Sequence, residues 1–253
     1  MKIVIITQNE PFYLYTNLKY LFNLLPENIE IVGCVIAPVS PFGKRESFLK
    51  KILKTYAVFG PKFFLYYSFR YFYSKLFKPS IDRLLHSKKI DKIKLIGSIN
   101  SKESLDKIRS YNPDLLVSIL GNQIFKRQLL ELAPKGSINL HSSLLPKYRG
   151  LMPTFWVLKN NENFTGVSVF FIDEGIDSGP IIIQKKIKIE TKIQAVLIRE
   201  TKKIGMELIA KAIELIDREK VKLISNPNNK KTYYSFPTKQ DVIEFKKAGK
   251  KFF

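Results

Sequence analysis

Two short polar segments contain the residues best suited to chemistry. The first is Asn139–Gly150, with the sequence Asn-Leu-His-Ser-Ser-Leu-Leu-Pro-Lys-Tyr-Arg-Gly, and the second is Asp173–Asp177, with the sequence Asp-Glu-Gly-Ile-Asp. Together they supply an amide, an imidazole and a carboxylate. This combination suits transfer of a small acyl group to an amine, which needs a donor for an oxyanion and a group that handles the amine's proton.

Three of these residues form a candidate catalytic trio. Asn139 and His141 are two residues apart, so on a strand both side chains lie on one face. Asn139 would donate to the oxyanion, and Asp177 would pair with His141, directly or through water, and relay protons. Each residue alone has an ordinary explanation as a turn cap, a strand-end histidine or a turn aspartate. Their joint occurrence favours catalysis. His86, the other histidine, does not lie in such a polar, turn-rich segment.

Alternating apolar strands and helices must position this trio. We predict strands at 2–7, 29–37, 92–97, 113–120, 136–141, 166–173 and 180–189, and helices at 14–25, 63–77, 100–108, 126–132 and 196–218. This order predicts an α/β fold with a Rossmann-like, doubly wound, mostly parallel sheet, in which ligands bind at the carboxyl ends of strands. His141 ends one such strand. Asn100 and Glu103 are predicted to form a capping box, and Gly175 and Gly179 to give the acidic turn positive φ.

Several classes of protein are disfavoured. The first strand is followed by Thr7-Gln8-Asn9-Glu10-Pro11 rather than a glycine-rich phosphate loop, which argues against a dinucleotide-dependent dehydrogenase. The single cysteine, Cys34, lies in an apolar run and is predicted to be a buried core thiol. Without a Cys/His cluster of zinc spacing, no metal is expected. Without a signal peptide or a transmembrane segment, a cytoplasmic protein is expected.

The chain is strongly basic. Its net charge is +21, from 43 Lys and Arg against 22 Asp and Glu. That balance favours anionic partners such as phosphorylated small molecules, acidic lipid or nucleic acid, although dispersed lysines also simply keep helix faces solvated.

An aromatic, basic insertion at 38–89 interrupts the α/β order. Within it, Phe63–Phe77 is apolar on nearly every side of a helical wheel. We interpret this segment as a helix packed in a crevice or at a dimer interface. The alternatives are an interfacial membrane helix and a basic-aromatic nucleic-acid surface. Five nearby cations are candidates for phosphate contacts: Lys44, Arg45, Lys50, Lys51 and Lys54.

The Asn-x-His pair, the Ser-Leu-Leu-Pro loop and Asp177 together resemble the folate-dependent formyltransferase family, over roughly residues 113–189. The resemblance implies the formyltransferase fold, 10-formyltetrahydrofolate as donor, and catalysis by Asn139 and protonated His141 with Asp177 keeping the ring charged. It implies that the pterin contacts residues of two segments, Gln123, Ile124, Phe125, Ile172, Asp173, Glu174, Gly175 and Ile176. The loop after His141 would contact the amine substrate through Ser142, Ser143, Leu144, Pro146, Tyr148, Arg149 and Gly150.

Within that family, which contains methionyl-tRNA formyltransferase and glycinamide ribonucleotide transformylase, the chain looks most like the sugar N-formyltransferases. The expected acceptor is a nucleotide-linked amino sugar for surface polysaccharide synthesis. Too few residues follow Ile189 for the barrel domain of the tRNA enzymes, and the 38–89 insertion is foreign to the purine-pathway enzyme. Methionyl-tRNA formylation, formyltetrahydrofolate hydrolysis and non-enzymatic membrane or nucleic-acid binding remain alternatives.

The expected organisation has two parts. Residues 1–190 form the catalytic domain, and 191–253 form a helix and an aromatic tail. We expect the tail to pack on the body or on a partner subunit, because free tails are rarely so aromatic. A homodimer is therefore expected.

Overall fold

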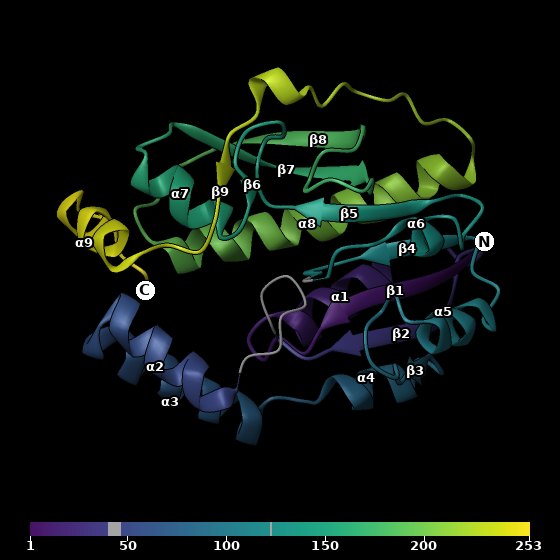
Figure 1. Ribbon diagram of the computed structural model, residues 1–253, viewed down its shortest axis with the longest axis horizontal. Helices are drawn as coiled ribbons and strands as arrows, with labels where there is room; N and C mark the ends of the chain where they lie inside the picture. The colour runs from purple at the N-terminus through teal and green to yellow at the C-terminus, as the bar shows by residue number, and fades with distance from the viewer. Residues whose placement is uncertain (40–46, 122) are drawn as a thin grey trace.

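The computed structural model describes residues 1–39, 47–121 and 123–253. Within them, seven strands form one sheet in the order β3-β2-β1-β4-β5-β7-β8 (Figure 1). The parallel strands are β1 (Lys2–Gln8), β2 (Glu30–Ala37), β3 (Asp91–Ile93), β4 (Leu115–Ser118) and β5 (Ser137–His141). Strands β7 (Phe164–Phe171) and β8 (Ile181–Lys188) continue the sheet beyond β5 in antiparallel pairs. The predicted Rossmann-like, mostly parallel sheet is confirmed.

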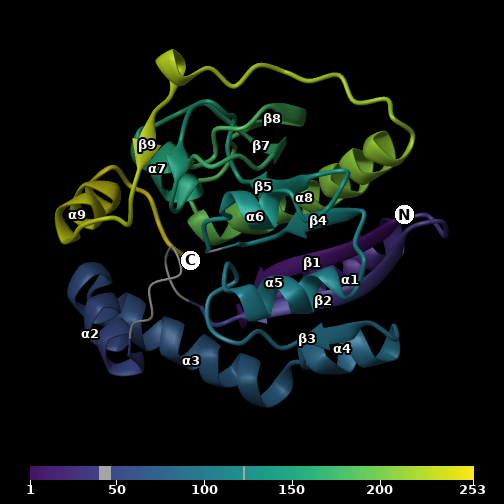
Figure 2. The same cartoon turned by 45° about the vertical axis from the view of Figure 1, so that its right-hand side comes forward.

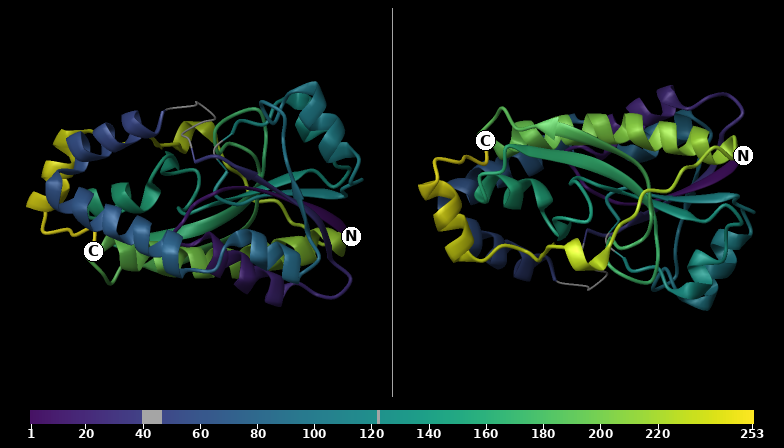
Figure 3. Two further views of the ribbon diagram at one scale, coloured as in Figure 1. Left: turned by 90° about the horizontal axis from the view of Figure 1, so that it is seen from below. Right: turned by 90° about the horizontal axis from the view of Figure 1, so that it is seen from above.

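Helices cover both faces of the sheet (Figure 3). One layer contains α1 (Leu14–Leu24), α4 (Ile81–Ser87) and α8 (Gln194–Asp217), and the other contains α5 (Lys102–Arg109) and α6 (Arg127–Leu130). Strand β1 serves both layers because successive side chains of a strand point to opposite faces. Ile3 and Ile5 pack with the first layer, and Val4 and Ile6 with the second. Such a doubly covered strand has a continuous apolar sequence, which explains why residues 2–7 were predictable.

The start of α5 differs from the prediction. Its N-cap is Ser101, whose hydroxyl accepts a hydrogen bond from the Ser104 amide at 3.3 Å. The predicted capping box of Asn100 and Glu103 is wrong. The Asn100 side chain instead donates to the Ile124 carbonyl and accepts from the Lys126 amide, both at 2.9 Å. Asn100 therefore ties the loop after β4 in place rather than beginning the helix.

Two helices joined at Gly60 form most of the insertion. They are α2 (Phe48–Phe59) and α3 (Pro61–Phe77), and Gly60 has a φ of +83°, a conformation that suits glycine. Both lie along one edge of the molecule (Figure 2). Two of the predicted phosphate-binding cations, Lys44 and Arg45, lie outside the described residues. In the part of the chain that the structure describes, no helix is long and apolar enough to cross a membrane.

The C-terminal segment packs on the rest of the chain. After a short 3₁₀ turn at Asn228–Lys230, β9 (Tyr233–Tyr234) pairs with β6 (Arg149–Gly150). Helix α9 (Lys239–Lys247) then packs against α7 (Pro153–Lys159) and α2.

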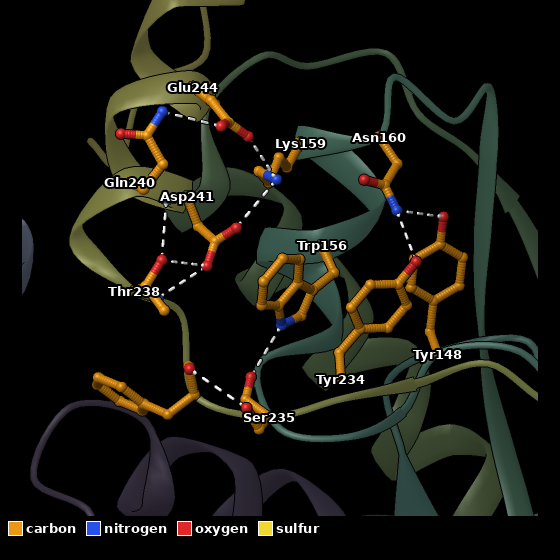
Figure 4. A network of polar contacts seen from close by, with 11 residues as sticks. Tyr148, Trp156, Lys159, Asn160, Tyr234, Ser235, Thr238, Gln240, Asp241 and Glu244 are labelled. Carbon is orange, nitrogen blue, oxygen red and sulfur yellow. Dashed lines mark hydrogen bonds and ion pairs between the residues drawn. The ribbon is translucent and has the colours of Figure 1, made fainter.

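Polar contacts fix this packing (Figure 4). The Trp156 indole donates to the Ser235 carbonyl at 3.1 Å, and the Lys159 ammonium lies 3.0 Å from Asp241 and 2.8 Å from Glu244. Since β6 belongs to the loop after His141, the C-terminal segment also holds one side of the predicted site.

Candidate active site

The carboxyl ends of three neighbouring parallel strands open into one cleft of about 540 Å³. Gln8 ends β1, Ser118 ends β4 and His141 ends β5, and all three line the cleft. The crossover direction reverses between β1 and β4, and in such sheets ligands bind at this point. Asn139, His141 and Asp177 also line the cleft, so the structure brings the predicted trio together.

His141 is buried and its ring is held from both sides. Its Nε2 lies 2.7 Å from the carbonyl oxygen of Tyr148. A carbonyl oxygen only accepts, so Nε2 carries a hydrogen. Its Nδ1 lies 3.5 Å from Oδ2 of Asp177, a second acceptor. An imidazolium satisfies both contacts, whereas a neutral ring would point a lone pair at the carboxylate.

Asp177 is fixed by its backbone and by two neighbours. Its Oδ2 accepts from the Gly150 amide at 2.8 Å, and its carbonyl accepts from the Asn226 side chain at 3.0 Å. Asp177 has a φ of +49°, a left-handed conformation that aspartate tolerates better than most residues. The carboxylate thus reaches His141 only because the turn bends back at this residue.

The predicted role of glycine in this turn is wrong. Neither Gly175 nor Gly179 is among the described residues with positive φ. Glycine is needed at 179 for space, since a Cβ there would lie 1.8 Å from the carbonyl oxygen of Phe171. The left-handed residue is Asp177 itself.

The Asn139 side chain lies in the cleft wall without a hydrogen-bond partner for Oδ1. This oxygen is buried, and no described residue bonds to it. A buried amide oxygen without a partner is costly unless something else completes it. The unpaired atom is the acceptor end of the amide, whereas Nδ2 is the end that could donate to an oxyanion.

Most of the residues predicted to contact the pterin line this cleft. They are Gln123, Ile124, Phe125, Ile172, Asp173, Gly175 and Ile176, whereas Glu174 does not line it. Ile124 is about half exposed, so an apolar side chain faces the cleft beside backbone polar groups. This mixture suits a flat heterocycle.

The loop after His141 is divided between the cleft and the interior. Ser142 and Gly150 line the cleft, whereas Ser143, Leu144, Pro146, Tyr148 and Arg149 do not. Ser143 is buried and donates to the Lys147 carbonyl at 2.9 Å. Leu144 packs beside Gly166.

Tyr148 and Arg149 support the loop from behind. The Tyr148 hydroxyl donates to Glu162 at 2.7 Å, and its ring stacks on Tyr234 with centroids 5.1 Å apart (Figure 4). Arg149 donates to Asn226 and Asn228. Burial lowers the pKa of Arg149, and the nearby Asp177 carboxylate opposes that effect. Because Asn226 contacts both Arg149 and the Asp177 carbonyl, this group helps to hold the turn that carries the Asp177 carboxylate.

A second wall of the cleft was not foreseen from the sequence. It comes from the loop after β1, α3 and α8, and it contributes Glu10, Phe12, Tyr13, Tyr67, Ile198, Thr201 and Lys202. The Glu10 carboxylate accepts from the Phe12 and Tyr13 amides at 2.9 and 2.8 Å. Burial raises the pKa of Tyr67 to about 12. This wall is therefore aromatic, with one fixed carboxylate.

Lys202 is the cation of this second wall. Burial lowers its pKa to about 8, and the Glu10 carboxylate opposes that effect. Among the described residues, no carboxylate lies within ion-pair distance of its ammonium, which lies 5.4 Å from the centre of the Tyr13 ring. A half-buried cation without an ion-pair partner would be stabilised by an anionic ligand. Within the described ranges, no cluster of three or more metal-ligating side chains was found.

Comparison with known proteins assigns the family. The family described as formyl transferase matches residues 84–230. The chain belongs to the formyl transferase family. The matched residues include β4, β5, the loop that follows, and the turn with Asp177, so the family covers the His141 wall of the cleft.

Relatives and solved structures point to different formyl transferases. The chain is 35% identical over 147 residues to methionyl-tRNA formyltransferase of Kosmotoga olearia, covering 58% of this chain and 47% of that protein. It is 40% identical over 117 residues to that of Clostridioides difficile, covering 46% and 38%. The chain thus spans about half the length, or less, of these relatives.

Among structures, an N-formyltransferase from Helicobacter canadensis in complex with folinic acid and dTDP-3-aminofucose has a TM-score of 0.58 at 21% identity, covering 95% of this chain and 72% of that one. Glycinamide ribonucleotide transformylase 1 from Symbiobacterium toebii has a TM-score of 0.61 at 17% identity, covering 89% and 92%. At these identities the likeness concerns the fold, which is that of the formyl transferases.

Proposed function

We propose that this chain transfers a formyl group from 10-formyltetrahydrofolate to the primary amine of a nucleotide-linked amino sugar. The observation that carries the proposal is the His141–Asp177 pair, which lines one strand-end cleft together with Asn139. These are the groups that amine acylation requires.

The cleft fits a reduced folate on the side of the 123–125 and 172–176 segments. Ile124 and Ile176 offer apolar surface, and the surrounding backbone offers donors and acceptors for a pterin ring. A bound 10-formyltetrahydrofolate supplies the carbonyl carbon that the amine attacks.

The three catalytic residues divide the work. Asn139 donates through its amide to the oxygen that gains negative charge. His141 in its charged form stabilises the same charge, and Asp177 keeps the ring charged through Nδ1. As the new C–N bond forms, the carboxylate accepts the proton that the amine loses. Water then carries this proton to the folate nitrogen, which leaves as its bond to the formyl carbon breaks. The Tyr148 carbonyl and the Gly150 amide keep the pair aligned throughout.

The second wall supports a phosphorylated acceptor. Lys202 offers a desolvated positive charge to a phosphate, and the rings of Phe12, Tyr13 and Tyr67 offer faces for a sugar or a base. An N-formyltransferase solved with folinic acid and dTDP-3-aminofucose has the same fold, which supports an amino sugar nucleotide as the acceptor class.

The test is mass spectrometry of products from 10-formyltetrahydrofolate and a panel of amino sugar nucleotides. The expected result is a gain of one formyl group on one member of the panel, with release of tetrahydrofolate. Release of formate without any acceptor would instead identify a hydrolase.

Methionyl-tRNA is the second candidate acceptor, because the relatives that share 35–40% identity are methionyl-tRNA formyltransferases. The net charge of +21 would also favour binding of the polyanionic tRNA. Formylation of methionyl-tRNA with strong salt dependence, and no reaction with sugar nucleotides, would replace the first proposal with this one.

A further inference from the structure

Helix α3 has two faces with different surroundings. Its inner face carries Phe63, Tyr67, Arg70 and Ser74, at intervals of four, three and four residues. The Ser74 hydroxyl donates to the Pro11 carbonyl, the Arg70 guanidinium lies over the Phe12 ring, and Phe63 packs on Phe252 with ring centroids 4.9 Å apart. This face holds the helix on the body of the protein.

The outer face repeats the same spacing on the opposite side of the helix. It carries Leu65, Phe69, Phe72 and Leu76, which are 69%, 69%, 61% and 75% exposed. Residues at this spacing form one continuous stripe along a helix. A stripe of four large apolar side chains on a surface marks an interaction site. Phe63–Phe77 was interpreted as a helix packed in a crevice or at a dimer interface, and within this chain only its inner face is packed.

Helix α2 presents a second stripe of the same kind. Leu49, Leu53 and Tyr56 follow at intervals of four and three residues, and each is more than half exposed. Tyr56 and Phe64 meet with ring centroids 5.7 Å apart, so the two helices form one unit. We call α2 and α3 together the aromatic hairpin.

The charge of the aromatic hairpin decides between possible partners. Residues 47–81 contain no Asp or Glu. Their cations are Lys50, Lys51, Lys54, Lys62, Arg70, Lys75 and Lys78. A second copy of the chain would bring two surfaces of equal positive charge together, which electrostatics disfavours. An anionic lipid surface would attract the cations and accept the apolar stripes.

We propose that the aromatic hairpin docks this chain on a membrane surface rich in anionic phospholipid. Helix α3 lies in the plane of the interface, with Leu65, Phe69, Phe72 and Leu76 among the acyl chains. The exposed residues Lys50, Lys62 and Lys75 lie beside the headgroups. The inner face stays on the loop after β1, which lines the catalytic cleft. The proposal is independent of the acceptor, since no residue of the outer stripe lines that cleft.

The experiment is co-sedimentation of the whole chain with vesicles. One set contains phosphatidylcholine alone, and the other contains an equal mixture with phosphatidylglycerol. Binding to the anionic vesicles is expected to be at least about tenfold stronger and to weaken in high salt. Equal binding to both sets, or binding to neither, would overturn the proposal.

Two variants locate the contact. The double variant Phe69→Ser/Phe72→Ser is expected to lose at least about tenfold in binding to anionic vesicles while formyl transfer in solution stays unchanged. The matched control is Ile96→Ser/Leu223→Ser, which removes two similarly exposed apolar side chains outside the aromatic hairpin. If both double variants lose binding equally, the hairpin is not the docking site.

A third variant separates insertion from simple charge attraction. Phe72→Trp adds an indole to a chain with one buried tryptophan, Trp156. On anionic vesicles with brominated acyl chains, fluorescence of this variant is expected to be quenched while that of the wild type is not. Absence of quenching overturns the insertion of α3. The proposal is also overturned if the wild-type chain does not bind vesicles but forms a dimer, and if Phe69→Ser/Phe72→Ser dissociates that dimer. A second copy of the chain would then be the partner.

Discussion

The two walls of the cleft hold their charges in different ways. On the wall of β5 and the 172–177 turn, His141 and Asp177 contact each other and fixed backbone groups of Tyr148 and Gly150. On the opposite wall, Lys202 is half-buried and has no ion-pair partner among the described residues. The His141–Asp177 pair has its partners before any ligand arrives, which would suit preorganised catalysis. Lys202 on the second wall would gain its partner from an anionic acceptor, as proposed above.

Replacement of His141 tests the first wall most severely. We expect His141→Asn to lower kcat about 10³-fold, because the variant loses the charged ring that stabilises the oxyanion. Steady-state formyl transfer gives the measurement, and His86→Asn is the matched control, since His86 is exposed on α4. Comparable losses in both variants would mean that His141 acts only in folding.

Replacement of Asp177 is expected to cost less, about 10²-fold in kcat. Asp177→Asn keeps the left-handed conformation and an acceptor for the Gly150 amide, so the change removes mainly the negative charge beside His141. The double variant with His141→Asn should be no slower than His141→Asn alone, because residues that act as a unit are not additive. Fully multiplicative losses would show that the two residues act separately.

The second wall is tested through pH. Lys202 has a pKa of about 8, lowered from 10.5 by burial, so it is charged below about pH 8 and neutral above. The KM for a phosphorylated acceptor should therefore rise above pH 8, by about tenfold per pH unit. Lys202→Arg should keep KM flat across this range, since arginine stays charged.

Lys202→Met should give a high KM at every pH while kcat changes little. The same rise of KM in wild type and Lys202→Arg would assign the pH effect to the acceptor's own amine. An unchanged KM in Lys202→Met would remove Lys202 from the acceptor site.

The two walls also differ in how many of their residues could be predicted from the sequence. Asn139, His141 and Asp177 were predictable because strand spacing places the first two on one face and because the motif resembles a known family. Lys202 stands next to Lys203 in a helix, a pattern typical of a solvated face. Its partial burial arises because Lys202 lies over the Tyr13 ring of the loop after β1, and this contact joins residues far apart in sequence.

The sheet, like the first wall, was predictable from local sequence. Buried strands give apolar runs, and six of the predicted strand ranges overlap β1, β2, β4, β5, β7 and β8 closely. Local sequence was less informative where tertiary contacts compete for a side chain. Asn100 was predicted as a cap but bonds the loop after β4.

Glycine in the Asp177 turn gives the smallest and most local test of the first wall. Gly179→Ala should destabilise the fold by about 1–3 kcal/mol, since the new methyl group meets the Phe171 carbonyl and the backbone must move. Because Asp177 lies two residues earlier in the same turn, kcat should also fall several-fold. Gly249→Ala is the control: its φ is +70° with open space around it, so it should cost about 1 kcal/mol and leave kcat unchanged. Thermal unfolding and steady-state kinetics of both variants distinguish crowding in the Asp177 turn from backbone strain alone. An unchanged kcat in Gly179→Ala would mean that transfer does not depend on the exact position of this turn.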